Sequence, residues 1–325
     1  MKKKTLSWWD SNNFGDALNP YIFRAFGVDV SYAQSNTADA IALGSLMERI
    51  FKGAHTKNET YFSSIPIDVW GSGVHFESGE HIEQPDIELP EKLIREANFW
   101  AVRGEKTKGR IEAILGRELG NDFPLGDPGL LMNRIIKGSD EKKYDLGIVA
   151  HFHEKNSEFI LDISKNIPSS IVLNVNSDPV KFIKKLTQCR AIISTAMHPI
   201  IVADSYGIPN IWATTGNERI SSYKYKDYYS SLGISSPPIF KLHENTFDFS
   251  QLIKLRETYS VGRKVIESLQ LGLINSFPYN HRNEKLKLLN FYDVQYLRWR
   301  QINSDYKNYS FLGKVKHYMY RWIFE

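Results

Sequence analysis

The chain has 325 residues, 42% of them hydrophobic and 13% aromatic, which exceeds the usual size of a single core and predicts two domains. Its formal net charge of +4 suits an anionic small substrate or a membrane surface, and is too small to indicate nucleic acid as a partner. Cys189 is the one cysteine, so the sequence excludes a disulfide framework and indicates a reducing, cytoplasmic compartment.

The N-terminal part alternates strand patterns with helix patterns, which predicts a parallel sheet with crossover helices. Strands are expected at residues 6–9, 28–32, 40–43, 68–70 and 99–102. A helix is expected to begin at Asn19 and Pro20 and to end at Gly27, since a cap residue followed by proline is a typical helix start. Residues 105–115 predict a further helix, closed by Gly116.

The C-terminal part shows the same alternation more clearly. Strands are expected at 144–152, 170–175, 190–194 and 210–213, and helices at 157–163 and from Asp178 and Pro179 onward. These strand–helix units predict a second doubly wound domain, and a charged, loop-like segment at 135–143 marks the boundary. From residue 249 the pattern is helical. The predicted division is an N-terminal Rossmann-like domain at 1–140, a C-terminal Rossmann-like domain at 141–283 and a helical tail at 284–325.

Residues 191–210, AIISTAMHPIIVADSYGIPN, combine a buried strand with a short helix. Pro199 suits the first position of that helix, so His198 is expected to be extended, at or beside the N-cap. His198, Ser194 and Thr195 would then lie at the carboxyl end of a strand, where open α/β sheets bind ligands and free N–H groups favour anions. Histidine exchanges protons near physiological pH, so the pattern indicates a functional site, although a histidine that only caps the helix also fits it.

Several motifs, in this order along the chain, resemble those of the polysaccharide pyruvyl transferase family. They are NFGDALNP at 13–20, VWGSG at 69–73, AVRG at 101–104, LGDP at 125–128, the stretch 191–210 and KYKDYY at 224–229. The resemblance covers the chain from about residue 7 to residue 280 and leaves the tail outside. It implies an α/β protein with two Rossmann-like domains facing across a cleft, as in GT-B glycosyltransferases. It also implies transfer of pyruvate from phosphoenolpyruvate to a saccharide, usually as a cyclic ketal that bridges two hydroxyl groups.

The donor implied by this resemblance carries a phosphate and a carboxylate, so its site needs cations and free helix-end N–H groups. We hypothesise that His198 is the acid/base or a phosphate ligand, with Ser194 and Thr195 beside it. Arg103 would grip the phosphate or the carboxylate, since its planar fork can bind either anion through two hydrogen bonds. A solvated arginine at a strand end is the alternative for Arg103.

Two positions depart from the family's pattern. Many members have glycine where this chain has Pro199, and some have arginine where it has Ala196. The phosphate-binding role of that arginine is then unfilled, and Lys224, Arg219 or Lys226 could supply the charge from the next loop. The lysines alternate with tyrosines, which suits either a solvated strand face or a basic rim around the donor, and we favour the rim.

Ketal formation also needs a proton for the donor's methylene carbon and a base for the attacking hydroxyl. Asp16 is the candidate for the sugar-side base, although an aspartate that caps a helix or shapes a turn is the alternative. Asn13 and Gly15 are expected to shape the loop around Asp16. Asp127 precedes a proline in a turn sequence, so a structural role is expected for it.

Other ligand motifs are incomplete. Gly71 and Gly73 lack the third glycine and the helix entry of a dinucleotide fingerprint. His151 and His153 alternate at a strand end without an evident third ligand, so we interpret them as polar edge residues rather than a metal site. We therefore expect no metal and no cofactor, with phosphoenolpyruvate as the donor substrate.

The segment at 311–324, FLGKVKHYMYRWIF, mixes basic and aromatic residues as interfacial helices do, and a packed terminal helix is the alternative. Membrane contact would place the protein at the inner face of the membrane and would suit a lipid-linked saccharide acceptor, a precursor of surface polysaccharide. Two other functions stay open: a GT-B glycosyltransferase that uses a sugar nucleotide, and a non-catalytic saccharide-binding protein of the same fold.

Overall fold

The structure of the protein is a computed structural model that describes most of the chain. The described residues are 2–9, 13–33, 37–47, 66–75, 96–154, 157–217, 220–242, 259, 261–279 and 286–308, with only the backbone described at 159, 161 and 302–308. Residues up to Leu288 pack as one compact unit, and helix α12 (Phe291–Asn308) belongs to a second unit.

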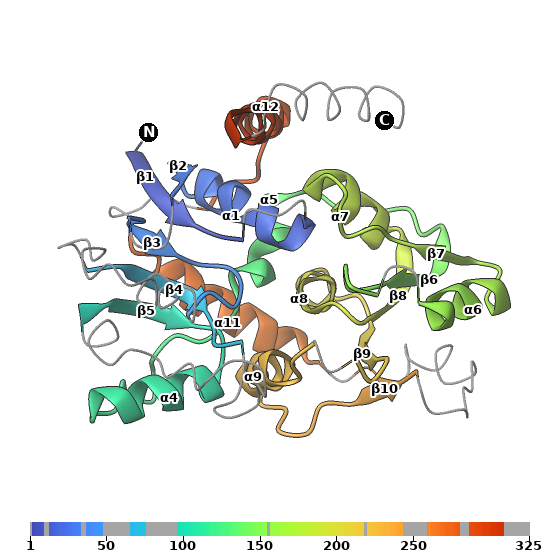
Figure 1. The fold of residues 1–325 in the computed structure, drawn as a ribbon, viewed down its shortest axis with the longest axis horizontal. Coiled ribbons are helices and arrows are strands. Elements are labelled where there is room, and N and C mark those ends of the chain that lie inside the picture. Colours follow the sequence, from blue (N-terminus) through green and yellow to red (C-terminus); the bar gives the residue numbers. More distant parts are fainter. Residues whose placement is uncertain are drawn as a thin grey trace. The chain divides into compact units, whose positions relative to one another are not determined.

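Five parallel strands in the described N-terminal part form one sheet in the order β2-β1-β3-β4-β5 (Figure 1). The strands are β1 (Lys2–Ser7), β2 (Val28–Tyr32), β3 (Ala40–Ile41), β4 (Asp68–Ser72) and β5 (Asn98–Val102). The helices that follow them are α1 (Phe14–Ala25), α4 (Glu105–Leu115), the 3-10 helix η1 (Pro128–Leu131) and α5 (Met132–Ile135). We call this set of elements the first half.

A second parallel sheet follows in the order β10-β9-β8-β6-β7 among the described residues. Its strands are β6 (Tyr144–Val149), β7 (Ser170–Val172), β8 (Cys189–Ser194), β9 (Asn210–Thr214) and β10 (Ile239–Lys241). Its helices are α6 (Glu158–Asn166), α7 (Pro179–Thr187), α8 (Met197–Ser205) and α9 (Tyr223–Ser231). We call this set the second half.

The two sheets have the same topology. When the strands are counted from the first of each sheet, both orders become 2-1-3-4-5, the doubly wound order with helices on both faces. The winding reverses between β1 and β3 in the first half and between β6 and β8 in the second, and sheets of this kind bind ligands at such reversals. The predicted α/β fold, with two Rossmann-like doubly wound halves and a helical C-terminal part, is confirmed.

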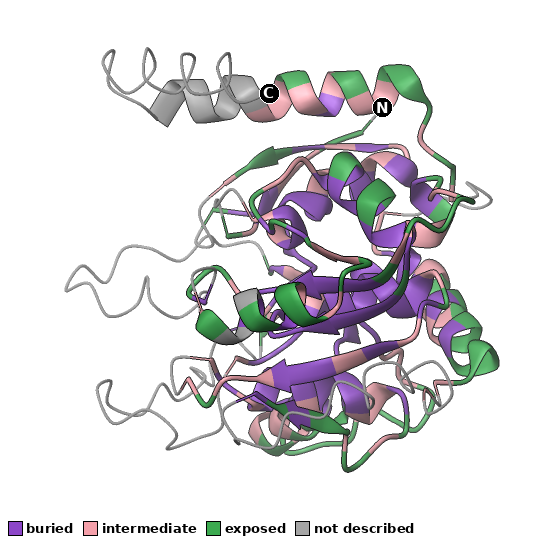
Figure 2. Cartoon of the chain, turned by 90° about the vertical axis from the view of Figure 1, so that its right-hand side faces the viewer, coloured by how far each residue is buried: buried purple, intermediate pink, exposed green. Residues whose placement is uncertain are grey.

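Each half has its own apolar core, formed where strands bury both faces (Figure 2). Val69, Val102 and Ile111 belong to the core of the first half. Ile148 and Ile193, from neighbouring strands, belong to that of the second. The near-continuous apolar run in β8 is what parallel strands covered on both sides require, and it explains why this strand was readable from the sequence.

Helix α11 (Arg263–Asn275) returns to the first half after the second sheet is complete. The indole N–H of Trp70 in β4 donates to the carbonyl oxygen of Leu273 at 3.1 Å. Phe277, just beyond the helix, stacks on Phe26 with ring centroids 4.0 Å apart. The chain thus crosses between the two halves twice, and α11 fixes the second crossing.

Helix α1 begins earlier than the sequence predicted. Asn13 caps it, Pro20 lies inside it, and the predicted start at Asn19 and Pro20 was wrong. Proline lacks the N–H that would bond the carbonyl of Asp16, but the side-chain amide of Asn19 donates to that carbonyl at 3.1 Å instead. The same amide pairs with both backbone groups of Leu43, so a side chain compensates the defect and ties α1 to the end of β3.

Helix α8 also begins before its proline. Its N-cap is Ala196 in an extended conformation, so His198 is helical and the prediction of an extended His198 at the cap was wrong. Pro199 is tolerated at the third position because the first four N–H groups of a helix have no partner within it. Residues 224–229 lie in helix α9, so the solvated strand face considered for the two lysines was wrong, and the basic rim around the donor stays a prediction.

Other boundaries were read correctly from local chemistry. Helix α4 spans Glu105–Leu115 as predicted, and Gly116 closes it with a φ of 65°. Asp178 caps α7 by accepting from the N–H of Lys181 at 2.9 Å. The first strand was misplaced, since β1 begins at Lys2 and pairs with β2 through its backbone, which a run of lysines does not reveal.

The predicted domain limits at 140 and 283 stay a prediction, because the halves share one compact unit. The basic and aromatic segment at 311–324 lies outside the described residues. In the part of the chain that the structure describes, no helix combines the length and the apolar character needed to span a bilayer.

Candidate functional site

The start of α1, at the topological reversal of the first sheet, contacts the second half of the molecule. The backbone N–H of Phe14 donates to the carbonyl oxygen of Val175 at 2.7 Å, and its ring stacks on Phe182 at 3.8 Å between centroids. A Cβ atom placed on Gly15 would lie 2.1 Å from Nδ1 of His198. The backbone of the first half therefore rests directly on the imidazole of the second, which assembles one site from both.

His198 faces this junction with an unused nitrogen. Its Nε2 atom is buried and has no hydrogen-bond partner among the described residues. Burial, together with the charges of Lys224 and Arg103, lowers the pKa of His198 to about 3. The imidazole is therefore neutral at physiological pH, and an orphaned ring nitrogen of this kind needs a ligand atom to offset its lost hydration.

Lys224 brings a buried positive charge to the same place. It begins the first turn of α9 beside Tyr223, and 7% of its surface is exposed. Within the described part of the chain its ammonium group has no hydrogen bond and no ion pair, and it lies over the Tyr225 ring, 5.5 Å from the ring centroid. Burial and the charge of Arg103 lower the pKa of Lys224 to about 8, against the opposing charges of Asp16 and Glu154.

Helix α9 is held firmly against the second sheet and α8. The hydroxyl of Tyr225 donates to the carbonyl oxygen of Thr195 at 2.7 Å, and its ring stacks on Trp212 at 4.4 Å. The hydroxyl of Tyr228 donates to the buried carboxylate of Asp204 in α8. The helices that carry Lys224 and His198 are thus fixed to each other, so the spacing of the two functional groups is set by packing.

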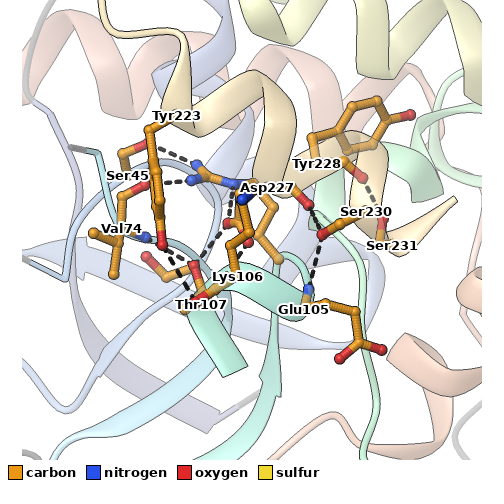
Figure 3. Close-up of polar contacts among 12 residues, drawn as sticks. Ser45, Val74, Glu105, Lys106, Thr107, Tyr223, Asp227, Tyr228, Ser230 and Ser231 are labelled. Atoms are coloured by element: carbon orange, nitrogen blue, oxygen red, sulfur yellow. Dashed lines mark hydrogen bonds and ion pairs between the residues drawn. The ribbon is translucent and has the colours of Figure 1, made fainter. Parts of the chain in front are cut away.

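Arg103 lies fully buried in a closed network at the end of β5. Its Nε donates to Oδ2 of Asp227 at 2.9 Å, Nη1 donates to Oγ of Ser45 at 2.6 Å, and Nη2 donates to the carbonyl oxygen of Val74. Asp227 accepts two further hydrogen bonds from Thr107, as Figure 3 shows. Each of the three guanidinium nitrogens already donates to a protein group, so we interpret Arg103 as adding charge to the junction, and its predicted grip on the donor stays a prediction.

Two glycines of the motifs make this network possible. A Cβ atom on Gly73 would lie 2.4 Å from Cζ of Arg103. One on Gly104 would lie 1.8 Å from the carbonyl oxygen of Asp227, so α9 can approach the start of α4 only because this residue has no side chain. Gly73, which belonged to the incomplete dinucleotide fingerprint, and Gly104 therefore have a packing role around a buried ion pair.

The hydroxyls of Ser194 and Thr195 are used to shape the loop after β8. Oγ of Ser194 accepts from the N–H of Ala196 at 3.0 Å and donates to backbone carbonyls. Oγ1 of Thr195 accepts from the N–H of His151 at 2.8 Å. These contacts tie the loops after β6 and β8 together, and the predicted donor-binding role of both hydroxyls stays untested.

Asp127 is a buried cap with a spare oxygen. Its Oδ1 accepts from the N–H of Gly129 at 2.8 Å at the start of η1, in line with the expected turn role. Its Oδ2 is buried without a partner among the described residues. Burial raises the pKa of Asp127 to about 6, with Asp227 adding to the rise while the Gly129 N–H and Arg103 oppose it.

The remaining predicted residues are spread around the junction. Asn13 caps α1 by accepting from the N–H of Gly15 at 2.9 Å, the loop-shaping contact that was expected. Asp16 follows in the first turn and is close enough to act on the pKa of Lys224. Lys226 is half-buried on α9, and Arg219 lies outside the described residues.

Sequence reasoning missed two residues in the loop after β6. Burial and the charge of Lys224 lower the pKa of His151 to about 3, which places His151 at the junction rather than at a solvated edge. Glu154 is 6% exposed, accepts from Oγ1 of Thr215 through Oε1, and has a buried Oε2 without a partner among the described residues. The available signal was their position, directly after a strand at a topological reversal.

His151 and His153 have ring centroids 5.3 Å apart. No group of three or more His, Cys, Asp or Glu side chains is placed to hold a metal ion in the described ranges. The expectation of a metal-free site therefore stays a prediction.

The sequence model of the family described as polysaccharide pyruvyl transferase matches residues 13–217, more than half of the chain. The chain belongs to the polysaccharide pyruvyl transferase family. The matched range begins at the cap of α1 and includes Gly15, Arg103, Glu154 and His198, whereas Lys224 in α9 lies beyond it.

Two curated proteins are similar to this member of the family. An uncharacterized protein of Acanthamoeba polyphaga mimivirus is 29% identical over 138 residues, or 41% of this chain and 47% of that protein. The succinoglycan biosynthesis protein ExoV of Rhizobium meliloti is 24% identical over 242 residues, or 71% of this chain and 66% of ExoV. The chain thus spans about half of the first relative and just under two thirds of the second.

Among solved structures, a candidate UDP-N-acetylglucosamine 2-epimerase from Listeria monocytogenes superposes with a TM-score of 0.47 at 8% identity. The superposition covers 89% of this chain and 100% of that protein.

Proposed function

We propose that this protein transfers pyruvate from phosphoenolpyruvate to a saccharide and forms a pyruvate ketal. The observation that carries the proposal is the largely buried side chain of Lys224, whose ammonium group has no ion pair in the described structure and lies near the orphaned Nε2 of His198. Burial of the side chain weakens the hydration of its charge, and a bound anion would offset that loss.

The donor's two anionic groups fit this environment. Lys224 would bind the phosphate or the carboxylate directly and would supply the charge that an arginine provides in some members of the family, where this chain has Ala196. Arg103 would add to the positive potential from its buried network without touching the ligand. Helix α8 begins at Met197, next to His198, and its N-terminal N–H groups would favour a negative charge there.

His198 would act as the proton carrier of the reaction. A neutral imidazole is a weak acid donor, but binding a multiply charged anion beside it would raise its pKa, because an opposite charge favours the protonated form. The proton would pass from Nε2 to the methylene carbon of the donor, which becomes a methyl group and leaves a cationic carbon at the centre of the reaction.

Two hydroxyl groups of the saccharide would then form bonds to that carbon. The first attack adds a C–O bond, and the second displaces the phosphate, so one donor and one diol yield a ketal and inorganic phosphate. Each hydroxyl loses a proton, and Asp16 of α1 is the candidate to accept one of them. A lipid-linked saccharide or a finished polysaccharide would be handled by the same chemistry.

The test is product formation by the purified protein. The protein would be incubated with phosphoenolpyruvate and hexosides or oligosaccharides that have free hydroxyl pairs, and phosphate release and the ketal methyl signal would be followed by NMR spectroscopy. Phosphate release that depends on the saccharide and is matched by ketal formation is expected. Transfer of sugar from a UDP-sugar, with no reaction of phosphoenolpyruvate, would overturn the proposal.

A further inference from the structure

Glu154 is a buried acid that the proposed mechanism leaves unused. It lies in the loop after β6, at the topological reversal of the second sheet, and the His151 N–H of this loop donates to Oγ1 of Thr195, just before α8, at 2.8 Å. Oε1 accepts a hydrogen bond from Oγ1 of Thr215, which follows β9 and holds the carboxylate in place. Oε2 is buried and has no donor among the described residues.

The character of Oε2 restricts its partner. A carboxylate oxygen accepts hydrogen bonds, and a buried one without a donor costs about 1–3 kcal/mol. The phosphate and carboxylate of a phosphoenolpyruvate donor offer it no proton at neutral pH. The hydroxyl of a saccharide offers a proton and is the other substrate that the site must hold.

The placement of Glu154 also complements that of Asp16. Both carboxylates lie close enough to Lys224 to act on its ammonium group, and they reach it from different halves of the molecule. A ketal that bridges two hydroxyl groups requires two deprotonations, one for each new C–O bond. A single carboxylate would have to release its first proton before it could take the second.

We propose that Glu154 binds a hydroxyl group of the saccharide acceptor through Oε2 and takes its proton as the oxygen bonds to the donor carbon. The O–H bond of the acceptor breaks, its proton passes to Glu154, and its electron pair forms the new C–O bond. This inference rests on the proposed function. It adds Glu154 to Asp16 as a second residue that takes a proton from the saccharide acceptor. Thr215 is a positioning residue that acts through Glu154.

The test replaces the carboxylate by an amide of the same shape. Glu154→Gln keeps an oxygen for Thr215 and removes the proton acceptor. With phosphoenolpyruvate and methyl hexopyranosides as probes, kcat is expected to fall about 100-fold or more, the range that a general base contributes. The melting temperature and the dissociation constant of phosphoenolpyruvate alone should stay unchanged. Glu158→Gln, the same change at an exposed position of α6, is the matched control and should keep full turnover.

The outcomes separate this inference from the proposed function. If kcat of Glu154→Gln stays within about twofold of the wild-type value, the proposed role of Glu154 is overturned and the proposed pyruvyl transfer is unaffected. A wild-type protein that neither binds nor consumes phosphoenolpyruvate overturns both. If Glu154→Gln does not fold, Thr215→Val serves instead, with kcat expected to fall about tenfold because the carboxylate is no longer held. Unchanged kcat in that variant contradicts the inference.

Discussion

At the residue scale, the contact between Gly15 and His198 decides whether the two halves of the site fit together. Gly15→Ala would place a Cβ atom 2.1 Å from Nδ1 of the imidazole, so the ring or α1 must move. Because a displacement of this size at a reacting group costs about 100-fold in rate, turnover should fall by that factor. Phosphate release from phosphoenolpyruvate measures it.

A second glycine of the first half provides the control for this change. A Cβ atom on Gly109, at an exposed position inside α4, would meet no atom within 4 Å. Gly109→Ala should therefore keep full turnover and raise stability by about 0.5–1 kcal/mol, since alanine is the better helix former. Equal turnover in the Gly15 and Gly109 variants would show that the contact between Gly15 and His198 does not affect the reaction rate.

Lys224 predicts a pH dependence of donor binding. Its pKa is lowered to about 8, so below pH 8 the free protein has the ammonium group ready, and above pH 8 it must first gain a proton. The phosphate of the donor is already ionised in this range, since its second pKa is about 6. The dissociation constant should therefore rise about tenfold for each pH unit above 8.

The measurement is titration of phosphoenolpyruvate at pH 7, 8 and 9 with wild type and Lys224→Met. The variant should bind more weakly at pH 7 and show no rise in the dissociation constant up to pH 9. His198 and His151 do not add a change in this range, because their pKa values are lowered to about 3. A wild-type affinity that is constant from pH 7 to 9 would contradict the assignment of Lys224.

At the element scale, α9 is joined to the turn between β5 and α4 of the first half through Arg103 and Asp227. Removing one partner leaves the other charge buried and unpaired, so Arg103→Ala should lower the free energy of unfolding by about 3–5 kcal/mol. Denaturant unfolding measures the loss. The same substitution in an Asp227→Asn background should cost less, because the uncompensated charge is already gone.

An exposed ion pair provides the comparison. Lys143 and Glu141 are 3.2 Å apart, but their side chains are 45% and 67% exposed. Lys143→Ala should cost less than about 1 kcal/mol, the usual range for surface pairs. Similar losses for Lys143→Ala and Arg103→Ala would mean that the buried pair does not join the two helices in the way described.

The elements also show how far sequence reasoning reaches. Local signals placed α4, α7 and most strands, because caps, left-handed glycines and apolar runs act within a few residues. The start of α1 was misread because proline usually marks the first turn of a helix. Here Pro20 lies inside the helix, and the side chain of Asn19 substitutes for its missing N–H. Helix α9 was hidden by polar and aromatic residues that give no clear helical period.

The candidate site was predicted in part for the same reason. His198 and Asp16 could be singled out from the motifs around them. The pairing of Arg103 with Asp227 could not, because the two residues are 124 positions apart and only the fold brings them together. Glu154 stands in a polar loop like many others, and its burial depends on Thr215 beyond the next strands.

At the scale of the whole molecule, two sheets of identical order direct their reversal points to one junction. Each half alone contributes an incomplete set, with Asp16 and Arg103 from the first and His198, Lys224 and Glu154 from the second. The central claim is therefore that phosphoenolpyruvate binds where the halves meet, with Lys224 as its principal cation.

Calorimetric titration of the purified protein with phosphoenolpyruvate tests this claim most directly, with Lys226→Met as the control for loss of a neighbouring lysine and a UDP-sugar as the comparison ligand. We expect binding of phosphoenolpyruvate in wild type and Lys226→Met, and a dissociation constant at least tenfold higher in Lys224→Met, since a charged hydrogen bond is worth about 1.5–3 kcal/mol. A binding heat with the UDP-sugar and none with phosphoenolpyruvate would contradict the account. So would an equal affinity of wild type, Lys224→Met and Lys226→Met for phosphoenolpyruvate.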